Sequence, residues 1–422
     1  MKTIEYAAFV ALDWGDRAHA FARQTAVTEE KKKGQIDASA EGLHGWLEAL
    51  RETYGGQPVA LIVEAGRNTL LHVLWEYPWI DIFPVPSAMS ARFRRAFKSS
   101  GAKDDEPDAE MLLLILLRHR DQLTQLRVNG SITQELAALV SARRSAVDQR
   151  TQFTNQLGRV LKSYYPQALE LVGEELGSEL ALDFLERWPE LLLVQQARPA
   201  TLRAFYRAHR SRSSERIEER ITRVSVSRPL ISNRAVIAPA MLQVAMFVAL
   251  LRIQQTHIAQ LEQRIEEVFV THPRASFFSA LPGAGPNLAP RLLVAFGDLP
   301  DRYPDAASLQ KYSGVAPVRE KSGRQVWTHW RWHAPKFLRQ TFVEWAGQTV
   351  IQCNWAKAYY RRRQRAGHDR QSILRSLAFK WIRILWRCWH DNTPYNEELY
   401  LHALKRRRSP VTDDLTVFLK KA

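Results

Sequence analysis

The stretch Lys103-Asp104-Asp105-Glu106-Pro107-Asp108-Ala109 places four carboxylates within five residues of an otherwise strongly basic chain. It lies between a basic segment, residues 92–98, and a leucine-rich run over residues 111–117, which we interpret as a buried helix. Asp105 and Asp108 are three residues apart, so at the start of a helix they lie on one face. Such like charges repel each other unless a divalent metal or a surrounding basic surface offsets them.

Two apolar runs earlier in the chain also end on carboxylates. Residues 6–12 end at Asp13, and residues 58–63 end at Glu64. Each run is followed by a glycine turn signal, which is typical of the end of a buried strand. Ligand sites of α/β sheets lie at strand ends of this kind.

The pattern around these strands predicts an α/β domain. We expect further strands over residues 19–25, before residues 34–37, and over 79–85, and helices over 39–54, 68–75 and from residue 87. The order of three strands, helix, strand, helix, strand, helix indicates a mixed sheet with helices on its faces. Four converging oxygen ligands would hold one or two hard cations such as Mg²⁺: Asp13, Glu64, Asp105 and Asp108. Taken singly, each acid is more often a solvated surface carboxylate, and the set of four is far more specific than any one of them.

Composition favours a polyanionic partner. The 422 residues are enough for two or three domains, and 60 Lys+Arg against 44 Asp+Glu give a formal charge of +16, which favours nucleic acid. The only cysteines, Cys353 and Cys388, exclude a disulfide framework and a cysteine-based zinc cluster. With no signal-peptide pattern and no uninterrupted apolar stretch of ~20 residues, we expect a soluble intracellular protein that does not enter a membrane.

The middle of the chain is predicted to be helical. Two long helices, over residues 131–165 and 239–269, are typical of an antiparallel coiled coil or dimerisation arm, and an ordinary helical bundle is the alternative. Between them, residues 167–234 give a mixed pattern with two helix-like pieces and an arginine-rich patch. We expect part of this segment to be mobile.

The C-terminal part combines a glycine-rich turn with clusters of basic residues. Pro282-Gly283-Ala284-Gly285-Pro286 precedes a helical run, as in helix-hairpin-helix elements whose backbone N–H groups approach a phosphate, although tight helix-helix turns use the same residues. Basic side chains at several places are expected to contact nucleic acid: Arg94, Arg95, Lys98, Lys321, Arg324, Arg361, Arg362 and Arg363.

Ser322 stands before a glycine, between Lys321 and Arg324. A serine hydroxyl is a weak nucleophile until a base or metal takes its proton, and cationic neighbours could hold a phosphate beside it. By itself a Ser-Gly pair in a basic loop is more often an ordinary turn. His329 and His333 lie near it in sequence, where packing or phosphate contact is favoured over proton transfer.

Taken together, two blocks of sequence resemble the insertion-sequence-110 family of DEDD transposases, recombinases guided by a bridge RNA. The N-terminal block comprises Val10-Ala-Leu-Asp13, Val63-Glu64-Ala-Gly66 and Lys103-x-Asp105-x-x-Asp108-Ala109. The C-terminal block comprises Pro282–Pro286, Phe296-Gly-Asp298, Tyr312–Pro317 and Lys321-Ser322-Gly323. The two blocks cover roughly residues 5–120 and 275–350, in the same order and at the same spacing as in the family.

The resemblance implies a RuvC-like (RNase H-like) domain in which Asp13, Glu64, Asp105 and Asp108 bind Mg²⁺, and a second domain with Ser322 as nucleophile. Asp104 stands where the family is expected to have Thr or a similar residue, so Asp104 is the alternative third ligand. The implied reaction joins donor and target double-stranded DNA, each paired to a loop of the non-coding RNA, through a covalent phosphoserine. The family works as a tetramer, a dimer of dimers formed through the coiled coil, in the bacterial cytoplasm at the nucleoid.

On this basis we expect four regions: a RuvC-like metal-binding domain (1–125), a helical coiled-coil region (126–272) with an insertion (about 167–234), a mostly α-helical transposase domain with a helix-hairpin-helix-like element (273–390), and a basic tail (391–422). Two other functions remain open. A junction nuclease would use the four acids to activate water and Ser322 only as a turn residue. A nucleic-acid-binding scaffold with an inactive metal site would cut nothing.

Overall fold

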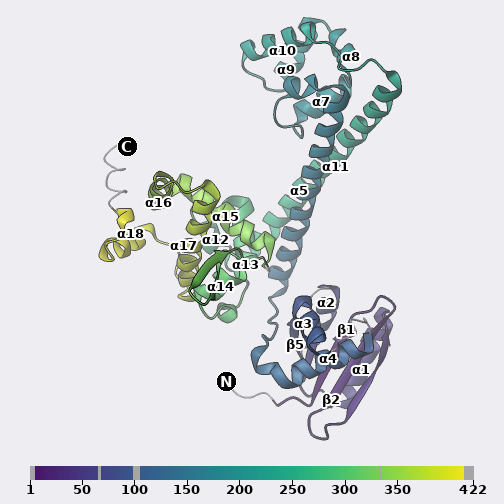
Figure 1. Cartoon of the computed structure of the whole chain (residues 1–422), viewed down its shortest axis with the longest axis vertical. Coiled ribbons are helices and arrows are strands. Elements are labelled where there is room, and N and C mark those ends of the chain that lie inside the picture. The colour runs from purple at the N-terminus through teal and green to yellow at the C-terminus, as the bar shows by residue number, and fades with distance from the viewer. Residues whose placement is uncertain (1–4, 65–67, 98–104, 333, 413–422) are drawn as a thin grey trace. The chain divides into compact units, whose positions relative to one another are not determined.

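The computed structural model describes residues 5–64, 68–97, 105–332 and 334–412. The chain forms two compact units, Met1–Val128 and Asn129–Ala422 (Figure 1). Each unit is described by itself below.

The first unit is built on a mixed five-stranded sheet. Its strands are β1 (Ala8–Asp13), β2 (Ala18–Thr25), β3 (Lys31–Asp37), β4 (Val59–Glu64) and β5 (Ile80–Val85), in the order β3-β2-β1-β4-β5. β2 pairs antiparallel with β1 and β3, whereas β1, β4 and β5 run parallel. The predicted mixed sheet is therefore confirmed. Because β1 and β4 run parallel, their C-terminal ends lie at the same end of the sheet.

Helices cover both faces of this sheet because its central strands are apolar on both sides. Along β1, Val10 and Leu12 pack with α1 (Ala40–Thr53) and α2 (Asn68–Leu74), while Ala11 packs with α4 (Asp105–His119) and α3 (Ser87–Phe97). This alternation follows from the two-residue period of a strand. The leucine-rich run is the buried part of α4, as predicted, and the 3₁₀ turn η1 (Arg120–Gln122) follows it. Ser39 caps α1 by accepting the Gly42 N–H.

Two long antiparallel helices form the axis of the second unit. These are α5 (Ser131–Tyr164) and α11 (Arg234–Thr271), which pack along each other (Figure 1). The start of α5 and the end of α11 belong to one hydrophobic core, and the end of α5 and the first half of α11 belong to another. The pair therefore joins two helical bodies.

The segment between the long helices contains more helices than its sequence predicts. It forms five helices: α6 (Gln167–Val172), α7 (Glu179–Arg187), α8 (Leu191–Gln195), α9 (Pro199–Ala208) and α10 (Ser214–Val226). Tyr165, Phe184 and Tyr206 are fully buried in the core that these helices share with α5 and α11. The sequence pattern suggested only two helical pieces because helices of five to ten residues contain too few repeats for periodicity to show them.

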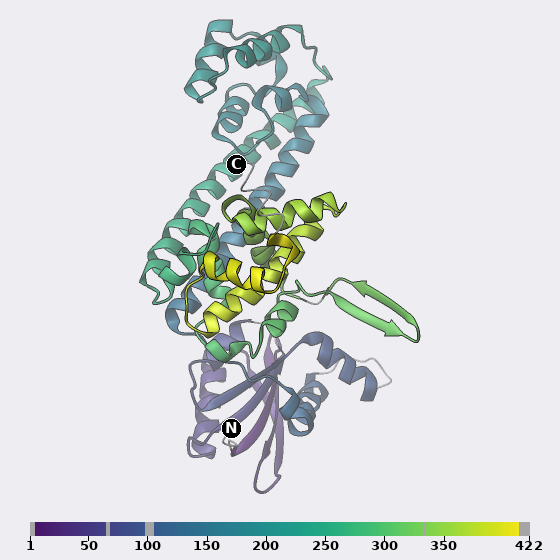
Figure 2. The ribbon, with the colours of Figure 1, turned by 90° about the vertical axis from the view of Figure 1, so that its left-hand side faces the viewer.

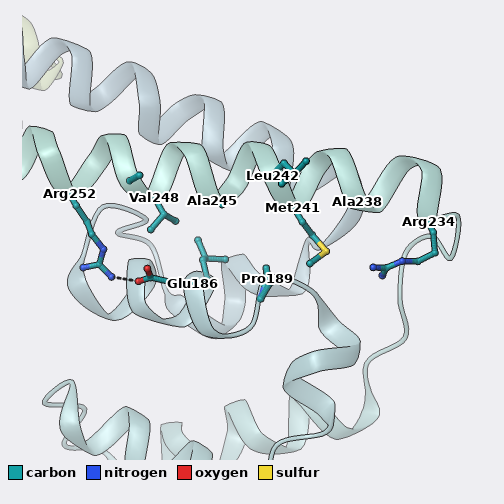
Figure 3. Close-up of a pocket in the computed structure, with 11 residues that line it drawn as sticks. Glu186, Pro189, Arg234, Ala238, Met241, Leu242, Ala245, Val248 and Arg252 are labelled. Carbon is teal, nitrogen blue, oxygen red and sulfur yellow. Dashed lines mark hydrogen bonds and ion pairs between the residues drawn. The ribbon is translucent and has the colours of Figure 1, made fainter.

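Helix α11 leaves part of its apolar surface uncovered. By length and composition it could cross a bilayer, although both of the second unit's cores bury parts of it. Leu242 and Ile253 are 74% and 63% exposed. A pocket of about 510 Å³ lies between α11 and α7, where Met241 lines it and the Arg252–Glu186 ion pair (2.7 Å) lies at one end (Figure 3).

The C-terminal body is a set of helices with one hairpin. The helices are α12 (Ala275–Ser279), α13 (Gly285–Phe296), α14 (Ala306–Tyr312), α15 (Lys336–Gln352), α16 (Asn354–Arg365), α17 (Arg370–His390) and α18 (Glu397–Arg406), with a 3₁₀ turn η2 (Pro300–Arg302). The hairpin consists of β6 (Val318–Ser322) and β7 (Gln325–His329). Four fully buried tryptophans form the centre of this core, which accounts for part of the aromatic content: Trp345, Trp355, Trp381 and Trp389. Helix α18 shows that part of the predicted basic tail is folded.

Asp298 fixes the long helices to the C-terminal body. Its carboxylate accepts the Gly130 N–H and the Thr133 hydroxyl (both 2.5 Å) at the start of α5, and His272 Nε2 (3.1 Å) after the end of α11. Burial alone would raise the pKa of Asp298, but these hydrogen bonds outweigh burial and lower the pKa. The carboxylate thus acts as a cap for α5 supplied from elsewhere in the chain.

We expect Asp298→Ala to lower the free energy of unfolding of this unit by about 1–3 kcal/mol, because it leaves buried donors unsatisfied. Since the folded pKa is lowered, the stabilisation is present above the ordinary aspartate pKa and is lost as the pH falls through the lowered value. Urea unfolding followed by tryptophan fluorescence at several pH values measures both effects. Glu398→Ala, at an exposed residue of α18, is the control. An equal loss of stability in both variants would contradict the role of Asp298 as a cap for α5.

Candidate active site

Two of the predicted metal ligands lie side by side at one edge of the sheet. Leu12 pairs with Val63 in the parallel register of β1 and β4, so Asp13 and Glu64 follow as the last residues of adjacent strands. Both are half-buried. The strand order therefore brings together two acids that are fifty-one positions apart in the sequence.

Asp108 has a protein cation as its partner. It lies in the first turn of α4 and is only 3% exposed. Arg94, on α3, donates to both of its carboxylate oxygens, at 2.8 Å from Nε and 2.5 Å from Nη2. A buried carboxylate requires such a partner, and a guanidinium matches both oxygens at once. Arg94, which is predicted to contact nucleic acid, holds a predicted metal ligand.

Asp105 is the first residue of α4, so Pro107 falls in the first turn, as predicted. The Asp105 side chain, and Asp104 with it, lie outside the described part of the structure, as does His333. Among the side chains that the structure describes, no group of three or more His, Cys, Asp or Glu residues is close enough to hold a metal ion. The carboxylate oxygens of Asp13 and Glu64 nevertheless have the chemistry that Mg²⁺ prefers.

Ser322 is the last residue of β6, at the turn of the hairpin. It pairs with Gln325, so only Gly323 and Arg324 form the connection. Gly323 has φ +57°, a conformation that two-residue hairpin turns require and that glycine adopts without strain. The hairpin extends away from the helices of the C-terminal body (Figure 2), and Ser322 is exposed.

A hydrogen-bonded cluster lies on the same hairpin. The Glu320 carboxylate accepts His329 Nε2 at 2.8 Å and Trp327 Nε1 at 3.0 Å. The bond from His329 lowers the pKa of Glu320, and the same bond raises the pKa of His329. His329 is therefore committed to Glu320 and, through Nδ1, to the Trp330 carbonyl (2.8 Å).

The predicted nucleic-acid contacts differ in their surroundings. Lys321 and Arg324 are exposed on the hairpin, and on α16 Arg361 and Arg362 are exposed while Arg363 is half-buried. Arg362 also donates to the Pro410 carbonyl (3.0 Å). Arg95 is in α3, but its side chain, like the whole of Lys98, lies outside the described residues.

The glycine-rich turn is shaped by packing as well as by sequence. Gly283, in the connection between α12 and α13, has φ +71°, and Gly285, the first residue of α13, has φ +54°. A Cβ on Gly283 would lie 2.9 Å from the backbone of Gln348 in α15, and the Gly283 N–H already donates to Gln352 Oε1 (2.8 Å). Close packing on α15 is thus sufficient reason for Gly283. Gly285 has open space around it.

The Arg94–Asp108 pair and the roles of Glu320 and Trp327 were not predicted from the sequence. The spacing of Arg94 and Asp108 in the sequence does not indicate a contact, because the contact depends on how α3 packs against α4. The contact between Glu320 and Trp327 could have been found from the sequence. Each of these residues lies two positions from the pair Ser322–Gln325 that closes the turn, so a predicted hairpin in this segment places them opposite each other.

Comparisons with known proteins agree with this arrangement of two blocks. A transposase family model, of the DEDD type named for IS110, matches residues 10–166. A second, for the transposase IS116/IS110/IS902 family, matches residues 275–361. The first match contains all four predicted metal ligands and α4, and the second contains the Ser322 hairpin.

Full-length relatives match across both blocks. A candidate mini-circle transposase for IS117 from Streptomyces coelicolor is 27% identical over 402 residues, covering 92% of this chain and 95% of the relative. An uncharacterised protein of insertion element IS110 from the same organism is 23% identical and covers 94% and 97%. One from insertion element IS116 of Streptomyces clavuligerus is 24% identical and covers 79% and 82%.

Proposed function

Because this chain belongs to the IS110 family of DEDD transposases, enzymes that cleave and join DNA, we propose that it recombines donor and target DNA through a phosphoserine formed on Ser322. The observation that carries this proposal is the position of Ser322. It is exposed at the turn of a projecting hairpin, between Lys321 and Arg324, which supply positive charge for a phosphate.

In the proposed step, Ser322 Oγ attacks a DNA phosphorus and loses its proton to a base. A new P–O bond to serine forms, the P–O bond to one deoxyribose breaks, and that sugar leaves with a free hydroxyl. One phosphodiester replaces another, so attack by a hydroxyl of the partner DNA rejoins the strands without ATP. The leaving hydroxyl takes up a proton, so the step is balanced.

The first unit is proposed to be a RuvC-like (RNase H-like) domain that holds one or two Mg²⁺ ions. Asp13 and Glu64 at the ends of adjacent parallel strands, with Asp105 and Asp108 in the first turn of α4, would be the ligands. When bound, the metal supplies positive charge that positions the phosphate and stabilises its added charge. Arg94 orients Asp108 through its two hydrogen bonds.

We propose that copies of the chain associate through α11, as a dimer of dimers. Leu242, Met246 and Ile253 fall on one stripe of this helix at spacings of four and seven, and their side chains are 74%, 49% and 63% exposed. Such a stripe on a long helix is typical of a helix-helix interface.

Leu242→Glu with Ile253→Glu is expected to shift the protein toward smaller assemblies by at least ~10-fold in dissociation constant, because two charges would be buried in the interface. Sedimentation velocity at several protein concentrations measures the assembly. Leu192→Glu, at a 48% exposed leucine on α8, is the matched control. If the double variant assembles like the control, the interface lies elsewhere.

We propose that the guide is a non-coding bridge RNA, whose loops pair with donor and target DNA. The proposed location of the protein is the bacterial cytoplasm, at the nucleoid. The net charge of +16 supports a nucleic-acid partner in general. The test is to purify the protein expressed with its flanking DNA and sequence the bound RNA. We expect one discrete RNA encoded beside the gene, whereas a random RNA population would contradict guidance.

A further inference from the structure

Trp327 is an exposed ring that is nevertheless held in place. Trp327 is 44% exposed, and its indole N–H donates a hydrogen bond to the Glu320 carboxylate at 3.0 Å. Glu320 is in turn held by His329 at 2.8 Å. A single exposed tryptophan needs no explanation, but one whose only polar atom is tied down presents its ring face in a fixed orientation.

The ring lies on the same face of the hairpin as Ser322. Side chains alternate along a strand, so Glu320 and Ser322 share a face, and the cross-strand pairs place Trp327 opposite Glu320 and Gln325 opposite Ser322. Trp327 is therefore the diagonal cross-strand neighbour of the serine, at a separation of about 7–8 Å. The other face carries Lys321 and Val326.

The base of the hairpin is anchored by a second tryptophan. Arg375 of α17 lies over the Trp330 ring at 3.6 Å from its centroid, and Arg339 of α15 lies 5.2 Å from it. These contacts tie the strand that carries Trp327 to two helices of the C-terminal body. Trp330 is thus used in packing, whereas the Trp327 ring has no described aromatic or cationic partner on its face.

We propose that Trp327 is a stacking platform for an unpaired DNA base next to the phosphate that Ser322 attacks. The hairpin register determines where the Trp327 ring lies relative to Ser322. That the neighbouring phosphate is the one attacked by Ser322 rests on the proposed function. Bases inside an intact duplex have both faces covered, so a protein ring stacks only on a base that is unpaired or displaced. Arg324 in the turn and Lys321 on the other face add positive charge to the hairpin, which attracts the DNA backbone.

The test uses full-length protein carrying Ser322→Ala, so that no covalent complex forms, and two DNA duplexes of the same sequence. One is fully paired, and the other has a central unpaired stretch with 2-aminopurine in it. Fluorescence anisotropy gives affinity, and 2-aminopurine quenching reports stacking directly. We expect tighter binding and stronger quenching with the unpaired duplex.

Adding Trp327→Ala is expected to weaken binding of the unpaired duplex by roughly 5- to 100-fold and to remove the quenching, with the paired duplex affected much less. Trp327→Phe should restore most of both effects because it keeps a ring. Val326→Ala, at a residue that is 45% exposed on the opposite face, is the control and should change neither. Circular dichroism checks that each variant is folded.

Unchanged affinity and quenching in Trp327→Ala would overturn the proposal, as would Trp327-dependent binding of an unpaired RNA loop but not of DNA. A different result would contradict the proposed function. If protein with Ser322 intact forms no covalent DNA adduct while Trp327-dependent quenching persists, the serine assignment is wrong and the stacking platform stands.

Discussion

Ser322→Ala is expected to abolish both the covalent protein–DNA species and recombination, by at least ~10³-fold, while folding and RNA binding remain at the level of the unmodified protein. The side chain is exposed at the hairpin turn and makes no buried contact, so its Oγ can be removed without creating a cavity. The substitution thus separates chemistry from stability. Denaturing gel electrophoresis with labelled donor DNA detects the adduct.

Two other variants sharpen this result. Gln325→Ala changes the exposed residue directly across the strand pair and should retain the adduct. Ser322→Gly removes the same hydroxyl and should match Ser322→Ala. Recombination at a normal rate by either serine variant would show that another group, or water, attacks the phosphate.

The second large effect is expected from the acids of the first unit. Asp13→Asn and Glu64→Gln each keep the size of the side chain and remove its charge, and we expect each to lower cleavage by on the order of 10²- to 10⁴-fold in Mg²⁺. The same loss is expected for the unmodified protein in EDTA. Cleavage assays across a range of Mg²⁺ concentrations measure both, and full activity in EDTA would contradict a metal site.

Asp108 needs a different design because it has two roles. Removing its charge leaves the Arg94 guanidinium without its partner, which destabilises the protein whether or not Asp108 binds metal. The pair Asp108→Asn with Arg94→Met removes both charges. If this double variant regains the stability lost by Asp108→Asn but not its cleavage, Asp108 acts on the metal. Recovery of both would reduce Asp108 to a structural partner of Arg94.

Much of the fold is predictable from local patterns. The strands ending at Asp13 and Glu64, the helix capped by Ser39, and the two long helices appear where apolar spacing and capping residues place them. These features depend on a few neighbouring residues, so a single sequence contains them. The short helices α6–α10 do not, because tertiary packing around residues such as Phe184 and Tyr206 determines them.

The candidate site was predictable in its residues but not in its contacts. Asp13 and Glu64 could be expected in one site, since each ends an apolar strand and ligand sites of α/β sheets lie at such strand ends. Their parallel pairing is seen only in the structure. The Arg94–Asp108 pair joins two helices and leaves no spacing that a sequence shows, whereas the Glu320–Trp327 bond can be found only once the segment is recognised as a hairpin. Asp298 is similar: it stood in a recognisable block, yet its use as a cap for α5 depends on helices brought together by folding.

The central claim is that Ser322 becomes joined to DNA. The most direct measurement traps the protein on donor DNA with its bound RNA and Mg²⁺, digests both protein and DNA, and locates the nucleotide-modified peptide by mass spectrometry. We expect the modification on Ser322, in the peptide that contains Gly323. DNA ends that carry no protein, or a modification on any other residue, would contradict the account.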